Sequence, residues 1–580
     1  MVRTSADELC QALEKETGMQ ASLNALCARL RLRPRDVEPM AKALAERGLL
    51  EITYPVNVLG SPILRLKRVI QAREPLLPRG REIVSYSVEA SGVPAGVSVL
   101  DVKEEPRPVY VLSIPPVGPY TEAILEGLRD ELAREMPVQV EEIVDARKAL
   151  ALKEKFFDSA AEKLSEKIPD ITEKDKHVLA GLLLHRMYGL GEIEMLMADD
   201  LLEEIVVNGS AQPISVYHRK YGWLKTNIYI PTEDDVYNYA TQIGRKSGRD
   251  ITLLAPIMDA HLATGDRVAA TLYPISTCGD TLTIRRFARE PWTIIDFIDP
   301  KLNTLDSEIA AFLWQAIQFE MNILVSGGTA SGKTSMLNTL CALIPPSSRN
   351  ITIEDTRELN LPSYLKFNWV PLTTRQPNPE GKGEVKMLDL MVTSLRMRPD
   401  RIVVGEVRRR REAEVLFEAM HTGHAVYSTI HADTAQQVLR RLTHPPFELP
   451  VTELQSLHLI LVMYRDRRRG LRRVYEVSEV GAASADEATL TSIYRWRARQ
   501  DAFEKVGEAA RVMEELNLHA GMSAEEIKAD ITRKKKVLEW MLKHNVRSVE
   551  QVGSVMGIYY KTPDVIEHAA EKDIHPKKVL

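Results

Sequence analysis

The stretch Met321-Asn-Ile-Leu-Val-Ser-Gly-Gly-Thr-Ala-Ser-Gly-Lys-Thr-Ser335 decides the fold of this 580-residue chain. Its apolar segment 323–325 predicts a buried strand, and residues 335–343 predict a helix immediately after the loop. Between them the sequence matches G-x-x-x-x-G-K-[ST], the phosphate-binding P-loop, in the strand–loop–helix context that the motif needs. The alternative, a chance glycine-rich turn, does not explain the strand before the loop and the helix after it.

The residue types of this loop suit a triphosphate. Glycines let backbone N–H groups approach phosphate oxygens, and the N-terminus of the following helix adds partial positive charge. Lys333 is expected to reach the β- and γ-phosphates, and the Thr334 hydroxyl to bind Mg²⁺. The predicted nucleotide-binding residues are Gly327, Gly328, Thr329, Ala330, Ser331, Gly332, Lys333, Thr334 and Ser335.

The composition describes a globular protein of about three to five domains. The apolar fraction is 44% and the net charge is −5, without the basic excess of a nucleic-acid packager. Four widely spaced cysteines, without C-x-x-C spacing, suggest reduced thiols in a cytoplasm and no zinc site. No apolar run approaches the ~18 residues of a membrane span, and no signal peptide is expected. We therefore expect any membrane role to act through a partner.

The first 70 residues predict a winged-helix-like module, because three helical stretches precede two strand-like segments. The helical stretches are 5–17, 19–31 and 35–48, and the strands are 48–54 and 63–67. Such modules often bind DNA, but the presumed recognition helix, residues 36–48, offers only Lys42 and Arg47 against three acids. We therefore favour assembly or partner docking over DNA binding for this module.

Two further apolar segments end in acidic residues. The strand beginning at residue 350 leads into Glu354, Asp355 and Glu358, and the strand beginning at residue 400 leads into Glu406. Parallel strands place their carboxyl ends together, so both clusters are expected beside the P-loop. Hydrolysis needs one carboxylate to orient water and another to support the metal. Since Gly405 stands where a Walker B motif usually has Asp, we assign water-mediated metal contact to Glu406 and the general base to Glu354.

Histidines bracket the next predicted strand. His424 and His431 are seven residues apart, and an odd offset along a strand directs side chains to opposite faces. At most one of them is expected to meet phosphate, and His431, at the carboxyl end, is better placed. His424 is equally well interpreted as a packed imidazole.

Arginines between residues 245 and 286 lie at loop and strand ends, where they are either solvated charges or clamps for a γ-phosphate. They are Arg245, Arg249, Arg267, Arg285 and Arg286. At the other end of the chain, residues 503–516, 523–544 and 548–556 predict charged amphipathic helices. The Lys534-Lys-Lys run is most simply a solvated helix face.

Four motifs together carry a family resemblance. Gly-Gly-Thr-Ala-Ser-Gly-Lys-Thr, Ile-Glu-Asp-Thr-Arg-Glu-Leu, Arg-Pro-Asp-Arg-Ile-Val-Val-Gly-Glu-Val-Arg and Thr-Gly-His-Ala-Val-Tyr-Ser-Thr-Ile-His-Ala occur in this order. The succession resembles the type II/type IV secretion, pilus and archaellum assembly ATPases, particularly their archaeal branch. The likeness extends over residues 170–500.

The resemblance implies roles for residues at matching positions. Glu354, Asp355 and Glu358 would form the Asp box, Glu406 the Walker B glutamate, and His424 and His431 the His box. Arg267 and Arg285 are similar to the N-domain arginines that approach the γ-phosphate, and Arg375 to the Arg box. The sequence departs from relatives where Arg409-Arg-Arg-Glu replaces the common Gly-Glu-Glu, and it lacks the tetracysteine insert of many bacterial relatives.

The resemblance also implies a cytoplasmic homohexamer that hydrolyses ATP with Mg²⁺, with ATP bound between an N-terminal and a RecA-like domain. It would act on a polytopic membrane platform protein at the inner face of the membrane, without inserting into it and without nucleic acid. The rivals are a DNA-translocating or conjugation ATPase, an archaellum motor, and a regulator that binds ATP without turnover. The expected fold is α/β, in five parts: a winged-helix-like module (1–70), a small α+β module (71–165), an N-terminal ATPase-associated domain (166–298), a RecA-like P-loop domain (299–500) and a helical appendage (501–580).

Overall fold

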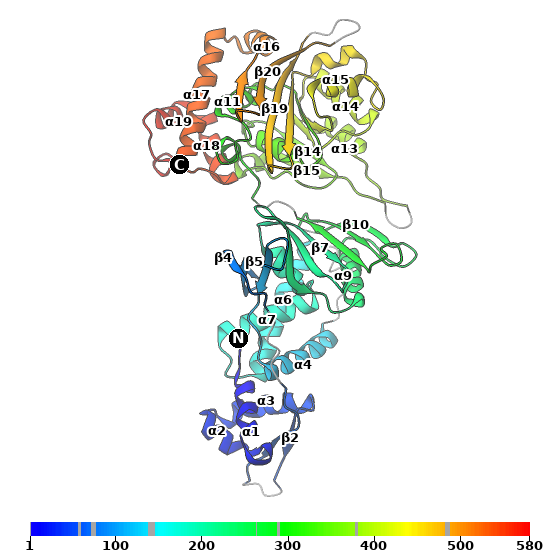
Figure 1. Cartoon of the computed structure of the whole chain (residues 1–580), viewed down its shortest axis with the longest axis vertical. Coiled ribbons are helices and arrows are strands. Elements are labelled where there is room, and N and C mark those ends of the chain that lie inside the picture. Colours follow the sequence, from blue (N-terminus) through cyan, green and yellow to red (C-terminus); the bar gives the residue numbers. More distant parts are fainter. Residues whose placement is uncertain are drawn as a thin grey trace. The chain divides into compact units, whose positions relative to one another are not determined.

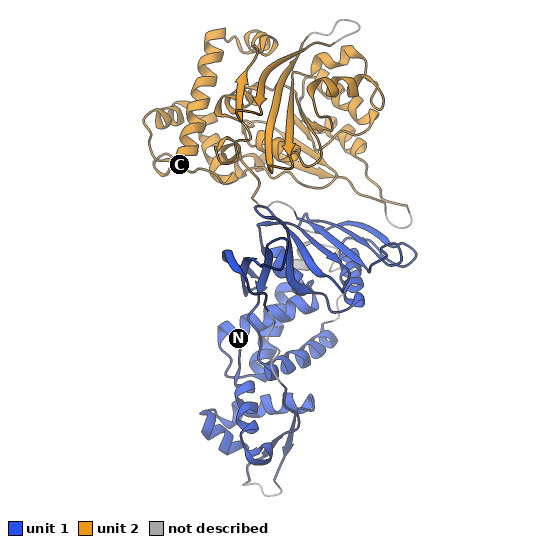
Figure 2. Ribbon diagram, in the orientation of Figure 1, with its two compact units in different colours: residues 1–287 blue, residues 288–580 orange. Residues whose placement is uncertain are grey.

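The computed structural model describes residues 2–55, 60–70, 77–136, 146–262, 264–286, 290–377, 381–481 and 488–580. The chain forms two compact units, unit 1 (residues 1–287) and unit 2 (residues 288–580), coloured separately in Figure 2. Figure 1 labels many of the helices and strands of the two units. Within the described residues, no helix is both long and apolar enough to span a membrane.

Unit 1 begins with the predicted winged-helix-like module. Its helices are α1 (Ser5–Glu14), α2 (Leu23–Leu30) and α3 (Pro34–Glu46), and its small antiparallel sheet has the order β1 (Gln20–Ser22), β3 (Ile63–Leu66), β2 (Leu50–Thr53). Strand β1 falls in a stretch predicted to be helical. The reason is local: the Ser22 side chain accepts a hydrogen bond from the N–H of Ala25 and so starts α2 at Leu23. The residues before Leu23 are thereby left to pair with β3.

A nine-stranded sheet organises the rest of unit 1, in the order β10-β11-β12-β7-β8-β9-β6-β5-β4. Every neighbouring pair is antiparallel except β6 and β9. The strands are β4 (Arg81–Ala90), β5 (Val93–Asp101), β6 (Val109–Ser113), β7 (Leu202–Asn208), β8 (Pro213–His218), β9 (Gly222–Tyr229), β10 (Ile257–His261), β11 (Arg267–Thr271) and β12 (Thr281–Arg285). The helices are α4 (Pro119–Glu135), α6 (Ala146–Lys167), α7 (Glu173–Met187), α8 (Ile193–Ala198) and α9 (Glu233–Lys246).

This sheet joins two parts that the sequence treats as separate modules. Val109 of β6 pairs with Lys225 of β9, and Tyr110 pairs with Thr226. Residues from both parts share one hydrophobic core, and the expected boundary at residue 165 falls inside α6. Because the pairing links residues more than one hundred positions apart, no local pattern in the sequence indicates it. The finer five-part division therefore stays a prediction within the two observed units.

Unit 2 has the predicted α/β fold of the RecA-like type, built on a second nine-stranded sheet of order β15-β14-β16-β17-β13-β18-β19-β20-β21. Strands β13 to β18 are parallel to one another, and β19 to β21 add antiparallel pairs at one edge. The strands are β13 (Ile323–Gly327), β14 (Asn350–Glu354), β15 (Trp369–Thr373), β16 (Arg401–Val404), β17 (Ala425–Ile430), β18 (Leu459–Asp466), β19 (Leu471–Val480), β20 (Leu490–Arg497) and β21 (Ala502–Lys505).

Helices cover both faces of this sheet, which is why β13 and β14 are buried along their whole length. On β13, Ile323 and Val325 pack into one core and Leu324 into the other. The helices of unit 2 are α10 (Ile294–Ile298), α11 (Ser307–Gln318), α12 (Lys333–Cys341), α13 (Met387–Ser394), α14 (Arg410–His421), α15 (Ala435–Thr443), α16 (Ala510–Ala520), α17 (Ala524–Lys543), α18 (Val549–Lys561) and α19 (Pro563–Glu571).

The C-terminal residues differ from expectation in two ways. Residues 502–505 form β21 at the edge of the sheet, where a helix was predicted from residue 503. The expectation that Lys534 lies on a solvated face is wrong, because its side chain is fully buried. Its ammonium pairs with Asp530 and lies 5.6 Å from the ring centre of Trp314 on α11. The helices after β21 thus share a core with the P-loop domain.

Candidate nucleotide-binding site

The P-loop follows β13 and leads into α12, as predicted. Gly327 has φ +148°, and a Cβ there would lie 2.4 Å from the carbonyl oxygen of Met463, so only glycine fits. Gly332 has φ +97° and stands at the N-cap of α12. The first-turn N–H groups of α12, beginning with Lys333, have no intrahelical acceptor and carry partial positive charge. This geometry suits phosphate oxygens.

Lys333 lies folded over the loop. Its Nζ donates to the carbonyl oxygens of Gly327 and Gly328, each at 3.1 Å, and lies 3.2 Å from Nδ1 of His431. Only 8% of the residue is exposed, and burial lowers the pKa of its ammonium, while the charge of Glu406 opposes that shift. The lysine therefore sits where a phosphate-binding cation belongs, and its present acceptors are weak neutral carbonyls.

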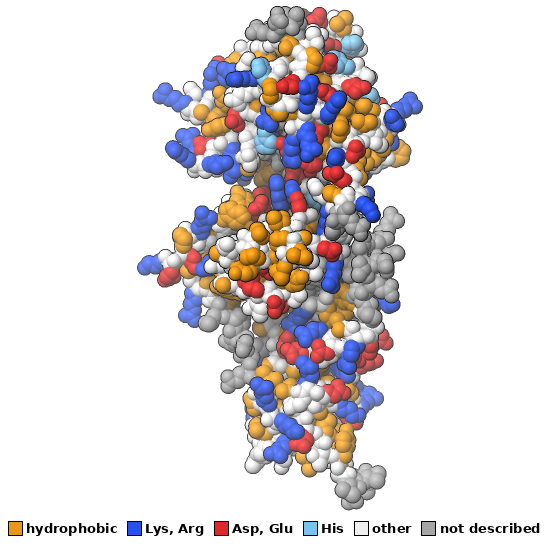
Figure 3. All heavy atoms as spheres, turned by 90° about the vertical axis from the view of Figure 1, so that its right-hand side faces the viewer, with side chains coloured by type: hydrophobic (Ala, Val, Ile, Leu, Met, Phe, Trp, Pro, Cys, Tyr) orange, Lys and Arg blue, Asp and Glu red, His pale blue; other side chains and the backbone are white. Residues whose placement is uncertain are grey.

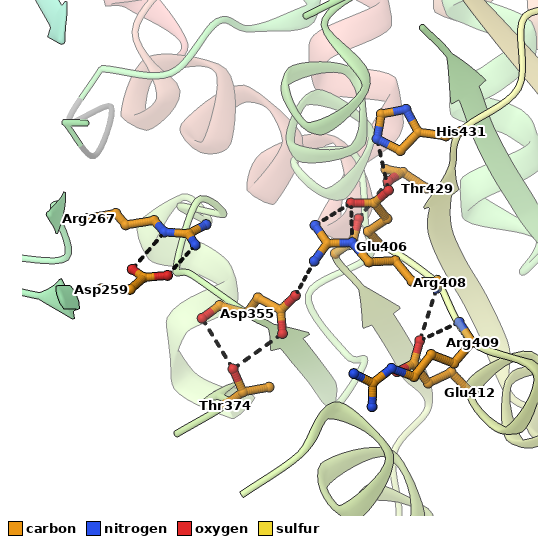
Figure 4. Close-up of polar contacts among 11 residues, drawn as sticks. Asp259, Arg267, Asp355, Thr374, Glu406, Arg408, Arg409, Glu412, Thr429 and His431 are labelled. Atoms are coloured by element: carbon orange, nitrogen blue, oxygen red, sulfur yellow. Dashed lines mark hydrogen bonds and ion pairs between the residues drawn. The ribbon is translucent and has the colours of Figure 1, made fainter. Parts of the chain in front are cut away.

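Glu406, immediately after β16, is held from two sides (Figure 4). Its Oε1 lies 2.9 Å from Nε2 of His431, and its Oε2 accepts from Nε and Nη2 of Arg408 at 2.9 and 2.7 Å. Arg408 also donates through Nη1 to Oδ2 of Asp355 at 2.9 Å. A continuous polar chain therefore runs Lys333–His431–Glu406–Arg408–Asp355 along the carboxyl ends of β13, β17, β16 and β14. We call it the polar chain.

The contacts of His431 determine which ring nitrogen carries the proton. A lysine ammonium can only donate, so Nδ1 of His431 accepts from it and Nε2–H donates to Glu406. Burial lowers the pKa of this histidine, and the positive charge of Lys333 lowers it further. The imidazole is therefore neutral near pH 7 and holds the Glu406 side chain by donating a hydrogen bond to it.

Glu354 is a different kind of carboxylate. It ends β14 and is 2% exposed. Its Oε1 accepts from the N–H groups of Glu358 and Leu359 at 2.9 and 3.0 Å, whereas its buried Oε2 has no hydrogen-bond partner among the described residues. Burial raises the pKa of this carboxyl to about 7, although the two backbone hydrogen bonds oppose the shift. An unpartnered buried carboxylate oxygen that titrates near neutrality is typical of a functional group.

The structure also explains why Gly405 replaces the usual aspartate. A Cβ at this position would lie 3.4 Å from Cγ of Glu354. An aspartate would thus put a second carboxylate beside a buried one, and like charges at that distance disfavour each other. The backbone of Gly405 is fixed by donation to the Ile353 carbonyl and by acceptance from the Thr429 hydroxyl.

The residues at this site suit a magnesium ion that is held partly through water molecules. Thr334, in the first turn of α12, offers a hydroxyl, while both oxygens of Glu406 already accept hydrogen bonds. Glu406 therefore suits contact with a metal through water better than direct ligation. Oε2 of Glu354 accepts no hydrogen bond from the described residues, so a ligand or a water molecule can donate to it at this edge of the sheet.

Other predicted residues lie elsewhere. His424, at the opposite end of β17, has its Nδ1 3.1 Å from the carbonyl oxygen of Ala419 at the end of α14. Arg375 donates to the carbonyl oxygen of Gly383 at 2.6 Å, within its own loop. Arg267 and Arg285 belong to unit 1, directly opposite each other on β11 and β12, and Arg267 pairs with Asp259, also drawn in Figure 4. Their roles at the nucleotide stay predictions.

Sequence reasoning missed one member of the site, Arg408. It joins the Glu406 and Asp355 carboxylates, which come from two different strands. A weak signal was present, because a residue two positions after Glu406 lies on the same side of an extended segment. The partner Asp355, 53 positions earlier, could be identified only from the strand order.

Comparison with known proteins identifies relatives of this chain. The family model described as "Type II/IV secretion system protein" matches residues 255–514. An uncharacterized protein of Methanocaldococcus jannaschii is 28% identical over 536 residues, which cover 90% of this chain and 91% of that protein. The type IV secretion system protein PtlH of Bordetella pertussis is 33% identical, over 47% of this chain and 88% of its own length.

Among solved structures, the VirB11 ATPase of the Brucella suis type IV secretion system, in complex with sulphate, is 25% identical. The match covers 48% of this chain and 90% of that one, with a TM-score of 0.25, which carries no argument about the fold. The chain shares 33% identity with PtlH over 88% of the length of PtlH. The chain belongs to the type II/IV secretion system protein family.

Proposed function

We propose that this protein hydrolyses MgATP as a cytoplasmic homohexamer and works at the inner face of the membrane on a polytopic platform protein. There it powers assembly of a pilus-like filament or protein secretion. The observation that carries the proposal is the polar chain beside the P-loop, together with the unpartnered Oε2 of Glu354. A protein that only bound nucleotide would have no need of a buried carboxylate held with one free oxygen.

The residues divide the chemistry between them. Lys333 and the first-turn N–H groups of α12 hold the phosphates, as residues 327–335 of the P-loop were predicted to do. Mg²⁺, when bound, neutralises phosphate charge, and Thr334 with Glu406 would hold it. Oε2 of Glu354 can accept a proton from the attacking water, because no described residue donates to it and its carboxyl pKa is near neutrality.

The polar chain links these groups to one another. Lys333 donates to His431, which in turn donates to Glu406, so a phosphate that draws Lys333 away from the loop changes the hydrogen bonding of both. His431 then serves to position Glu406. The roles predicted for Arg267 and Arg285, as cations that meet the γ-phosphate when the domains close, belong to this proposal.

Assembly into a ring has support on unit 1. Five large apolar side chains are exposed near the edge strand β10: Leu253, Leu254, Ile257, Tyr273 and Ile275. We call them the β10 patch; Leu254 is 99% exposed. Figure 3 shows apolar side chains gathered on one face of unit 1. Contiguous exposed apolar surface of this kind marks a protein interface, and a second copy of the chain is the occupant that a ring requires.

The rival function, a DNA-translocating or conjugation ATPase, finds little support in the winged-helix-like module. Arg47, the C-cap of α3, pairs with Glu126 and Asp130 of α4. Lys42 of α3 pairs with Glu38 on the same helix, and Nε of Arg35 in its first turn lies 3.9 Å from Oδ1 of Asp36. DNA binding needs cations available to phosphates.

ATPase rates of the purified protein test the proposal, measured alone, with double-stranded DNA, and with vesicles carrying the platform protein, while light scattering records the mass. Hexamers stimulated by the platform vesicles and indifferent to DNA agree with it. Stimulation by DNA alone, decreasing steeply with salt, would favour the translocase instead. An archaellum motor would differ only in which platform protein stimulates it.

A further inference from the structure

Arg472 lies against the P-loop on the side away from the polar chain. It is the second residue of β19 and is exposed. Its Nε donates to the carbonyl oxygen of Ala330 at 3.2 Å. A Cβ on Gly332 would lie 3.5 Å from Cδ of Arg472, so the arginine stem passes directly over the N-cap of α12.

The terminal nitrogens of this guanidinium, Nη1 and Nη2, have no acceptor among the residues that the structure describes. The hydrogen bond from Nε to Ala330 fixes the orientation of the guanidinium and leaves Nη1 and Nη2 available to bind a ligand. A guanidinium is always charged, and its planar fork matches two oxygens of a phosphate.

The neighbouring arginine on β19, Arg473, makes different contacts from those of Arg472. Arg473 points to the other face of β19 and is buried. It donates through Nε and Nη2 to the two oxygens of Asp501, both at 2.7 Å, and through Nη1 to the Leu302 carbonyl. All three guanidinium nitrogens of Arg473 thus donate to acceptors within the fold, whereas Arg472 directs its terminal nitrogens at the edge of the P-loop.

The strand order determines which part of a nucleotide Arg472 can reach. Glu406 and His431 follow β16 and β17, on one side of the P-loop strand β13, and Arg472 comes from β19, on the other side. Lys333 joins the first group through His431. The γ-phosphate belongs with the polar chain, so the phosphates nearest Arg472 are those beside the N-terminus of α12.

We propose that Arg472 binds the diphosphate portion of the nucleotide, the α- and β-phosphates that ATP and ADP share. This inference rests on the proposed nucleotide site and adds a cation supplied by the P-loop's own unit. Residues 465–472, around the turn of the β18–β19 hairpin, strengthen it, since five cations in this stretch outnumber its one acid, Asp466. They are Arg465, Arg467, Arg468, Arg469 and Arg472. The resulting positive field favours anions at this edge.

Titration of the full-length protein with fluorescent ADP and with a non-hydrolysable ATP analogue, both with Mg²⁺, tests the inference. We expect Arg472→Ala to raise Kd about 10-fold for both nucleotides, by the same factor, because the lost contact is to shared phosphates. In turnover, KM should rise while kcat at saturation stays within about twofold of the wild type. Arg472→Lys should recover part of the affinity, because the charge remains without the fork.

Arg468→Ala is the matched control: it removes a cation from the hairpin turn that has no contact with the P-loop among the described residues. Both affinities should stay within about twofold of the wild type, because only a small part of the positive field is lost. Thermal unfolding without nucleotide should be the same for wild type and Arg472→Ala, and if the alanine variant does not fold, Arg472→Lys and Arg472→Gln carry the comparison. Unchanged affinities in Arg472→Ala, a loss confined to the ATP analogue, or an equal loss in Arg468→Ala would each overturn the inference. Nucleotide binding without hydrolysis by the wild type would instead contradict only the proposed function.

Discussion

Nε2 of His431 lies 2.9 Å from Oε1 of Glu406, so the histidine that follows β17 holds the carboxylate that follows β16. The opposite ring nitrogen accepts from Lys333 of the P-loop. One neutral imidazole therefore connects the phosphate-binding lysine to the carboxylate proposed to support the metal. This link is the basis for treating the loop and the acidic edge as one site.

Replacing His431 should slow turnover without weakening nucleotide binding. We expect His431→Ala to lower kcat about 10- to 100-fold, since Glu406 loses the donor that orients it. The Kd for ADP should change less than about twofold, because ADP lacks the γ-phosphate and would meet Lys333 of the polar chain rather than His431. His431→Gln should restore part of kcat if its amide donates to Glu406. Single-turnover hydrolysis and ADP titration measure both, with His421→Ala, an exposed histidine paired with Glu453, as the control. An equal loss of kcat in both alanine variants would contradict the proposal that His431 positions Glu406.

The buried carboxyl group of Glu354 should make the unfolding free energy of the protein depend on pH. Its carboxyl pKa is raised by burial from 4.5 to about 7 in the folded protein. Below pH 4.5 the group is neutral in both states; between pH 4.5 and 7 only the unfolded chain is ionised, so stability falls as pH rises through this window. Relative to Glu354→Gln, the wild type should lose about 3 kcal/mol across the window and nothing further above it. Urea unfolding of both proteins from pH 4 to 8 measures the difference, and parallel curves would show that Glu354 is not desolvated.

The buried pair of Lys534 and Asp530 should be sensitive to the loss of one partner. Lys534→Met leaves the Asp530 carboxylate buried, and among the described residues its remaining side-chain donors are Gln315 and the partly exposed Arg533. We expect a loss of about 3 kcal/mol in unfolding free energy. Lys536→Met, two positions later on an exposed part of α17, should change stability by less than about 0.5 kcal/mol. Denaturant unfolding compares them. Equal effects would mean that Lys534 is solvated in solution, as its sequence neighbourhood suggests.

The β10 patch should be needed for assembly. Leu254→Asp adds a charge to a side chain that is almost fully exposed in the single chain, so the fold should tolerate it. If a second copy covers the patch, burying that charge is costly and the oligomer should dissociate. Light scattering gives the mass and circular dichroism the fold, with Val69→Asp, an exposed apolar position outside the patch, as the control. A hexamer that survives Leu254→Asp would exclude the patch from the ring interface.

The sequence predicted those parts of the molecule that depend on short-range patterns. The P-loop, its flanking strand and helix, and the acidic ends of β14 and β16 each lie within about ten consecutive residues, and all form as expected. The pairing of β6 with β9, the burial of Lys534 against Trp314, and the position of Arg472 over Gly332 depend on contacts between distant segments. A lysine in a charged helix predicts exposure unless its tertiary partners are known, and here those partners are an aspartate one turn away and two aromatic rings.

The most direct test of the central claim is the steady-state ATPase rate of the purified protein beside that of Lys333→Ala. If the P-loop and its polar chain form a hydrolytic site, the wild type hydrolyses MgATP and the variant loses at least about 100-fold, because the loop's cation and its link to His431 are both removed. A Lys333→Ala protein that hydrolyses ATP at the wild-type rate would place the activity elsewhere and contradict the account.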